Sequence, residues 1–198
     1  MAENKALLNW EEKEKELGST VDKLDYPIDP GIKETIIVLN LLGFPTSASC
    51  EGHLDRAVAA PWVDIISNDT DSLKGKADAA FGLADESVAL HIEAQTDQLY
   101  DEANRLREVA FRPLLLLGEK LLKLMEKFYE NRKVLFDQRI TLEQFGYSLR
   151  IYSQGAVVQD ALEQMEKAKR LASYQIEMKE FTEFLKGEYF SRSALGDL

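Results

Sequence analysis

Residues 29–53 read DPGIKETIIVLNLLGFPTSASCEGH and carry both the most sharply bounded helix of the chain and its densest polar cluster. Asp29 suits the N-cap position, because its carboxylate can accept hydrogen bonds from the first exposed amides, and Pro30 suits the first helical position, which needs no backbone donor. Gly43 can adopt the left-handed conformation that ends a helix. Apolar residues recur at helical spacing between these ends, at Ile32, Ile36, Leu39 and Leu42. The spacing therefore predicts a helix over residues 30–42.

Segments with the character of β-strands follow this helix. Their residues alternate between apolar and polar, or are β-branched at the centre, over residues 61–67, 88–92, 134–143 and 147–153. The run over residues 88–92 is short, so a helix remains possible there. Gln144-Phe145-Gly146 separates the last two, and we predict that it forms the turn of a hairpin. Residues 44–49 fit a strand or an extended loop, and the polar residues 68–82 fit a loop.

Helical spacing also occurs on both sides of these strands, over residues 7–17, 97–133 and 157–186. Pro113 should split or kink the second of these helices, and Gly187 is suited to end the third. We therefore predict a single α+β domain over residues 1–198, with a small, mostly antiparallel sheet, helices packed on one face and two long helices in the second half. In this prediction residues 1–18 form a peripheral N-terminal helix and residues 188–198 a frayed tail.

The composition is that of a globular protein with an acidic bias. The 198 residues include 24 Lys and Arg against 35 Asp and Glu, which gives a net charge of −11, and 45% are hydrophobic. Cys50 has no second cysteine to pair with, which fits a reducing compartment. No apolar run approaches the roughly 20 residues of a membrane helix, and residues 1–5 lack the features of a signal peptide. We expect a cytoplasmic protein without a membrane partner, and the negative charge disfavours nucleic acid.

Residues 46–53 gather most of the groups that could bind a ligand or take part in a reaction. They include the only cysteine of the chain and one of its two histidines. They also follow the best-defined helix, and loops held by rigid elements are common positions for functional sites. Any chemistry would use Cys50, Glu51 and His53 as catalytic residues. The predicted ligand-binding residues are Thr46, Ser47, Ser49, Gly52 and Asp64.

Four interpretations of this cluster are open. His53 could be the base that activates a Cys50 nucleophile. Cys50 and His53 have the spacing of metal ligands, but carboxylates such as Asp55 or Asp64 would have to complete the shell, and we assign no metal site. The cluster could also line a polar pocket for a small anionic or amide-bearing group, which places the fewest demands on the exact positions of the side chains. In the last interpretation Cys50 is a small buried hydrophobe, and Glu51 and His53 only brace the turn.

Two polar residues in the predicted strands have structural explanations. His91 lies in an alternating run and fits the solvent face of a sheet, or a hydrogen-bonded position within it. Asp64 lies between two β-branched residues and fits the outer face of its strand. If Asp64 is buried, it needs Arg150 or Arg56 as a partner, because an unpaired buried carboxylate is costly.

We therefore expect a protein that binds a small molecule at the turn Ser49-Cys50-Glu51-Gly52-His53, with no cofactor that the sequence identifies. Glycine-rich phosphate loops, Gly-x-Ser-x-Gly elbows and His-Glu-x-x-His motifs are absent. The alternative is a non-catalytic interaction or assembly protein, in which the two long helices pair and form a homo-oligomer. The aromatic stretch Tyr174 to Phe190 would then be a partner surface, although apolar stripes on helices are more often core.

Part of the first third of the chain resembles two known families. The residues Leu39-Asn40, Gly43-Phe44-x-Thr46 and Ser49-Cys50-Glu51-Gly52-His53, preceded by Tyr26 to Ile32 and followed by Ala60 to Asp64, are similar to the core of a family of uncharacterised prokaryotic proteins. Asn40, Thr46, Ser49, Cys50 and Gly52 resemble, more remotely, the tRNA wybutosine-synthesising methyltransferase family, in which a Ser-Cys-Ser-Gly-Arg turn follows a helix. Glu51 and His53 replace that Ser and Arg, so this resemblance implies a similar turn and not methyl transfer.

Overall fold

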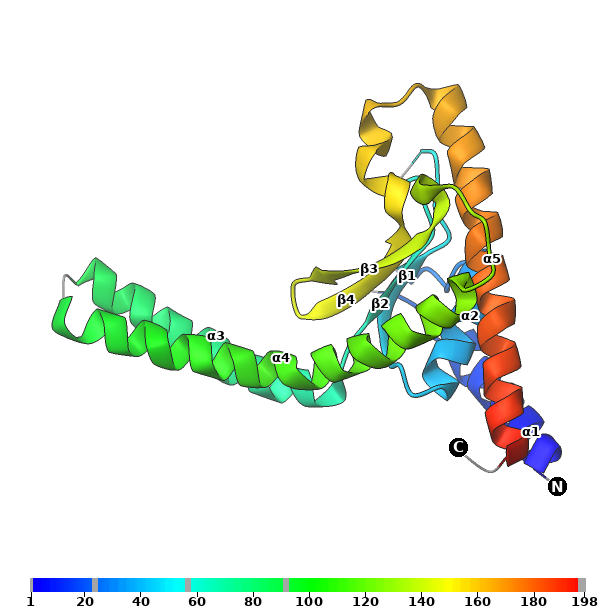
Figure 1. Ribbon diagram of the computed structural model, residues 1–198. Helices are drawn as coiled ribbons and strands as arrows, with labels where there is room; N and C mark the ends of the chain where they lie inside the picture. Colours follow the sequence, from blue (N-terminus) through cyan, green and yellow to red (C-terminus); the bar gives the residue numbers. More distant parts are fainter. Residues whose placement is uncertain (1, 23–24, 56–57, 91–92, 196–198) are drawn as a thin grey trace.

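The computed structural model describes residues 2–22, 25–55, 58–90 and 93–195 (Figure 1). Over these residues the chain forms, in order, α1 (Ala2–Gly18), α2 (Pro30–Leu41), β1 (Thr46–Cys50), β2 (Trp62–Ile65), α3 (Asn68–Ala89), α4 (Glu93–Tyr129), η1 (Phe136–Gln138), β3 (Ile140–Phe145), β4 (Ser148–Ser153), η2 (Gln154–Ala161) and α5 (Gln164–Leu195). The two η elements are 3₁₀-helices. The helix predicted over residues 30–42 and the α+β class are confirmed. Among the described residues, no helix combines the length and the apolar character that crossing a membrane requires.

A four-stranded antiparallel sheet lies in the body of the molecule, with the strand order β1-β2-β4-β3. One face is apolar, because Val63 and Ile65 of β2 pair with Ile151 and Leu149 of β4, and all four side chains are buried. This face packs against residues of α2, α4 and α5 in the main core. Figure 1 shows these helices gathered on one side of the sheet. The small antiparallel sheet with helices on one face is therefore as predicted.

The C-terminal helix belongs to the core. Phe181 and Tyr189 of α5 are at most 2% exposed, so these aromatic side chains belong to the core, as apolar stripes on helices usually do. The predicted end at Gly187 and the frayed tail from residue 188 are wrong over the described residues, because α5 continues to Leu195. Packing against α1 explains the extension: the Tyr189 hydroxyl donates to the Ala6 carbonyl at 3.2 Å. These contacts outweigh the small helix-breaking tendency of one glycine.

α3 and the first part of α4 form an antiparallel arm that projects from the body (Figure 1). Small side chains lie between the two helices and allow them to approach closely; they are Ala77, Ala84, Ala103 and Ala110, each fully buried. At the base of the arm the Thr70 hydroxyl donates to the Ala110 carbonyl at 3.1 Å. The prediction of a loop over residues 68–82 is therefore wrong, and at residues 88–89 the chain is helical and not a strand. Residues 91–92, including His91, lie outside the described residues.

α4 continues through Pro113 without a break, and Figure 1 shows it bending near its middle, the part that contains this proline. The first part of the helix pairs with α3, and the second part reaches the sheet and the core. It meets α5 near its end, where the Phe128 and Phe181 ring centroids are 5.1 Å apart. The long helix α4 thus has α3, and not α5, as its antiparallel partner.

The predicted hairpin is present with a shifted turn. Gln144 and Phe145 remain in β3, and Gly146 and Tyr147 form the connection, with Gly146 at φ = +58°. Residues 136–138, predicted as strand, form η1. The last helix was predicted to begin at about residue 157. Residues 154–161 form η2 instead, and α5 begins at Gln164.

Candidate functional site

The turn after β1 has a backbone conformation that glycine adopts most readily. Gly52 has φ = +87°. A Cβ atom at this position would lie 2.6 Å from Leu171 Cδ1 and 2.7 Å from the backbone carbonyl carbon of Ala60. The turn therefore lies tightly between α5, which carries Leu171, and the loop before β2. Gly52 shapes the backbone here, and its place is structural.

Hydrogen bonds from two helices hold the same turn. The Glu51 carboxylate accepts the Gly31 amide of α2 at 2.7 Å, and Asp29 Oδ2 accepts the Glu51 amide at 3.1 Å. On the other side, Gln175 Nε2 of α5 donates to the Glu51 carbonyl at 3.1 Å. The Glu51 side chain thus braces the turn against the first turn of α2, as one of the four interpretations expected.

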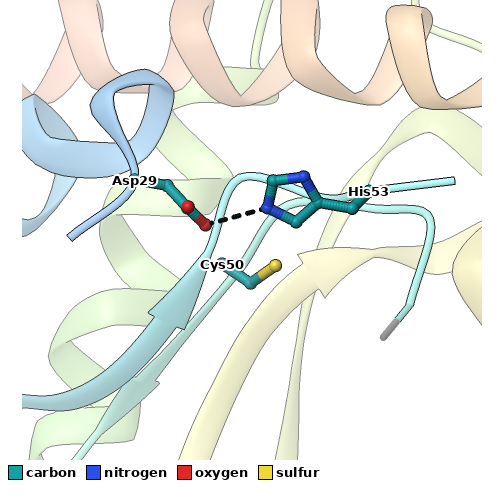
Figure 2. Close-up of side chains that lie close together, drawn as sticks. All are labelled: Asp29, Cys50 and His53. Carbon is teal, nitrogen blue, oxygen red and sulfur yellow. Dashed lines mark hydrogen bonds and ion pairs between the residues drawn. The ribbon is translucent and has the colours of Figure 1, made fainter. Parts of the chain in front are cut away.

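Asp29, Cys50 and His53 converge at this turn (Figure 2). One oxygen of Asp29, the sulfur of Cys50 and one ring nitrogen of His53 all lie within 4.8 Å of one another. Asp29 Oδ2 is 3.2 Å from His53 Nε2, and the Cys50 sulfur accepts the Gly52 amide at 3.3 Å. The Asp29 and His53 side chains are about one-fifth exposed, and Cys50 is buried. The three donors therefore share one partly enclosed position.

A cavity of about 490 Å³ opens beside these residues. Its wall is formed by β1, by residues between Leu17 and Asp22 and between Tyr26 and Asp29, and by side chains of neighbouring elements. Five of the predicted site residues line it: Thr46, Ser47, Ser49, Cys50 and His53. Trp62, Ile28 and Ile36 add apolar surface, and Asp29 adds a carboxylate. The structure thus places the predicted thiol and imidazole at the wall of one cavity.

Glu51, Gly52 and Asp64 do not line this cavity. Asp64 is buried and receives two hydrogen bonds from Arg150, at 2.7 and 2.8 Å. Arg150 was one of the two partners that the sequence suggested for a buried Asp64. Its guanidinium also lies over the rings of Trp62 and Phe145, at 4.0 and 3.9 Å from their centroids. The pair therefore organises the sheet face that the helices leave uncovered.

Another polar contact lies on the same sheet face. The Tyr152 hydroxyl donates to the Glu143 carboxylate on the neighbouring strand. Burial, followed by this hydrogen bond, raises the pKa of Tyr152 to about 12. Tyr152 therefore stays protonated, and keeps this contact between β3 and β4, well above neutral pH.

Asp29 is the site residue that the sequence analysis missed, because it was interpreted only as an N-cap. Its side chain makes no capping hydrogen bond to α2 and lies instead toward the turn of residues 50–53. The carboxylates that were considered as metal ligands do not reach the site: Asp55 is exposed, and Asp64 pairs with Arg150.

Comparisons of the chain with family models, with curated proteins and with solved structures find no match. The resemblances drawn from residues 26–64 therefore stay predictions.

Proposed function

We propose that the protein binds a small organic molecule in the cavity beside β1. The observation that carries this proposal is the convergence of Asp29, Cys50 and His53 at the wall of one cavity of about 490 Å³. Small-molecule sites typically have volumes of roughly 300–1,000 Å³ and combine apolar walls with a few convergent polar groups. Trp62 and Ile28 supply part of the apolar wall here.

The polar groups favour an amide-bearing ligand over an anionic one. The hydroxyls of Thr46, Ser47 and Ser49 can each donate and accept hydrogen bonds. The carboxylates of Asp22 and Asp29 also line the cavity, and they would repel an anion while accepting an amide N–H group. A carboxamide with an apolar body therefore matches both parts of the wall.

The proposal is tested by a thermal-shift screen of the full chain against a panel of small carboxamides. A ligand present at 100 times its Kd stabilises the folded state by about 2.7 kcal/mol. For a chain of this length we expect this to raise Tm by roughly 5–10 °C.

Two tryptophan variants locate the binding. Ala48→Trp adds a large side chain to the cavity wall and should abolish the Tm shift. Ala79→Trp, the same substitution at an exposed position of α3, should retain it. A screen without a hit contradicts the proposal, and so does a hit that both variants bind like the unchanged protein.

A second candidate function is assembly of copies through the arm formed by α3 and α4. The observation that favours it is the exposure of Leu83, Leu90 and Val109, at 57%, 62% and 43%, on or beside the two helices that project from the body. Large apolar side chains that are exposed on a projecting element are common at contact sites between proteins.

Sedimentation equilibrium tests this second function. We expect a concentration-dependent dimer that Leu83→Glu and Leu90→Glu each weaken. Ile176→Glu replaces an equally exposed apolar side chain of α5 and should leave the dimer unchanged. A monomer at all concentrations contradicts assembly through the arm.

A further inference from the structure

We propose that Asp29, Cys50 and His53 bind a divalent transition metal ion of the zinc type at the wall of the cavity. This inference concerns the cavity of the proposed function but does not depend on an organic ligand, because metal uptake is measured with the ion alone. Three protein ligands leave one position of a tetrahedral shell for water or for a carbonyl oxygen of a bound molecule.

The spacing of the three donor atoms fits a single ion. Ligand atoms at about 2.0–2.3 Å from zinc lie roughly 3.3–3.6 Å from one another in a tetrahedron. Asp29 Oδ2 and His53 Nε2 are already 3.2 Å apart, and the set with the Cys50 sulfur lies within 4.8 Å. Binding of an ion would draw the Cys50 sulfur toward the other two donors.

The chemistry of the donors selects the class of metal. A thiolate, an imidazole and a carboxylate form a mixed sulfur, nitrogen and oxygen set, which suits zinc and its neighbours in the transition series. Calcium and magnesium require shells built from oxygen and do not suit a sulfur ligand. Three protein ligands are typical of zinc sites that keep one coordination position open, whereas structural zinc sites use four protein ligands.

The orientation of the imidazole favours a metal over a Cys–His nucleophile. In a nucleophilic triad the two ring nitrogens have different partners, one facing the nucleophile and the other the acid. Here Asp29 faces Nε2, and Figure 2 shows the Cys50 sulfur on the same edge of the ring. The acid and the thiol therefore lie on the same side of the imidazole, which is the arrangement of ligands around a shared ion.

The surrounding hydrogen bonds orient two of the donors. The Glu51 amide donates to Asp29 Oδ2, and the Gly52 amide donates to the Cys50 sulfur. These two amides hold the carboxylate oxygen and the sulfur in place beside the imidazole. Such outer contacts position metal ligands in proteins and are part of the site.

Cobalt titration of the full chain, after treatment with a chelator, tests the site. Bound Co²⁺ should give a thiolate-to-cobalt charge-transfer band and the visible bands of tetrahedral cobalt, and added Zn²⁺ should remove both. Elemental analysis after dialysis should find one zinc per chain. Asp29→Asn, Cys50→Ser and His53→Gln should each weaken Zn²⁺ binding by at least about 100-fold, because even outer-shell substitutions cost about 10–100-fold.

Glu51→Gln is the matched control. It removes a carboxylate charge from the same turn, but its amide oxygen can still accept the Gly31 N–H group, and Glu51 is not among the donors. Asp29→Asn likewise keeps an oxygen for the Glu51 amide, so both variants should unfold at the same denaturant concentration as the unchanged protein. Retained binding in Glu51→Gln with lost binding in Asp29→Asn supports the site. No cobalt bands, or equal bands in Asp29→Asn, overturns it, while the carboxamide screen still tests the organic ligand separately.

Discussion

Replacing Gly52 by alanine is expected to lower the free energy of unfolding by about 2–5 kcal/mol. Part of the loss, roughly 1–2 kcal/mol, comes from placing a residue with a Cβ atom at φ = +87°. The rest, about 1–3 kcal/mol, comes from forcing that atom to within 2.6 Å of Leu171 and 2.7 Å of the Ala60 backbone. The Ala60 backbone cannot rotate away as a side-chain end can. Urea unfolding followed by circular dichroism measures the change as a lower midpoint at an unchanged slope.

Gly43→Ala separates the two parts of this loss. Gly43 also has a positive φ, of +83°, but a Cβ atom there meets nothing within 4 Å. It should lose only the conformational part, roughly 1–2 kcal/mol. Equal losses in the two variants would show that the turn of residues 50–53 moves easily, and would contradict the tight packing described above. Gly52→Ala should also weaken zinc binding, because Cys50 and His53 flank the altered residue.

The elements that the sequence analysis located are those whose signals are local. The helix over residues 30–41 is bounded by Asp29-Pro30 and Gly43 and has an apolar face, so chain-local rules identify it. β2 and β4 were identified because their residues alternate or are β-branched around an apolar face. In each case the side chains that pack in the folded state are the same ones that make the pattern visible.

Local sequence rules did not predict α3. Its residues are polar and include Gly75 and Gly82, which favoured a loop. The buried face includes three small side chains seven residues apart, Thr70, Ala77 and Ala84. Alanine contributes little to an apolar pattern, but it lets α4 approach closely along the whole arm. The helix therefore depends on a partner that lies later in the chain, and the segment alone does not display it.

Asp29 was missed for a different reason: it lies about 20 residues before Cys50 in the sequence, and the chain brings the two together only by reversing its direction between them. α2 has 12 residues and rises about 18 Å, and the five residues of β1 extend over about 17 Å. Because Gly43 reverses the chain between two elements of equal length, the end of β1 comes back beside the start of α2. This brings Asp29 to Cys50 and His53. Because both lengths can be read from the sequence, the pairing of Asp29 with Cys50 and His53 was predictable from it.

Replacing Arg150 by methionine is expected to destabilise the fold by about 3–5 kcal/mol, because it leaves the buried Asp64 carboxylate without its partner. The Arg150 side chain donates two hydrogen bonds to Asp64, and both side chains are at most one-fifth exposed. Loss of the guanidinium from between Trp62 and Phe145 removes two cation–π contacts as well. Urea unfolding of the variant measures the loss.

The double variant Asp64→Asn with Arg150→Met distinguishes the cost of an unpaired charge from the loss of packing. If the unpaired carboxylate dominates, neutralising Asp64 should recover a large part of the stability lost by Arg150→Met, with a coupling energy of about 0.5–3 kcal/mol. Arg150→Lys keeps the charge but not the two parallel hydrogen bonds, so it should lie between the unchanged protein and the methionine variant. Additive losses in the double variant would mean that the arginine acts mainly by packing between the two rings, and that Asp64 reaches water once its partner is removed.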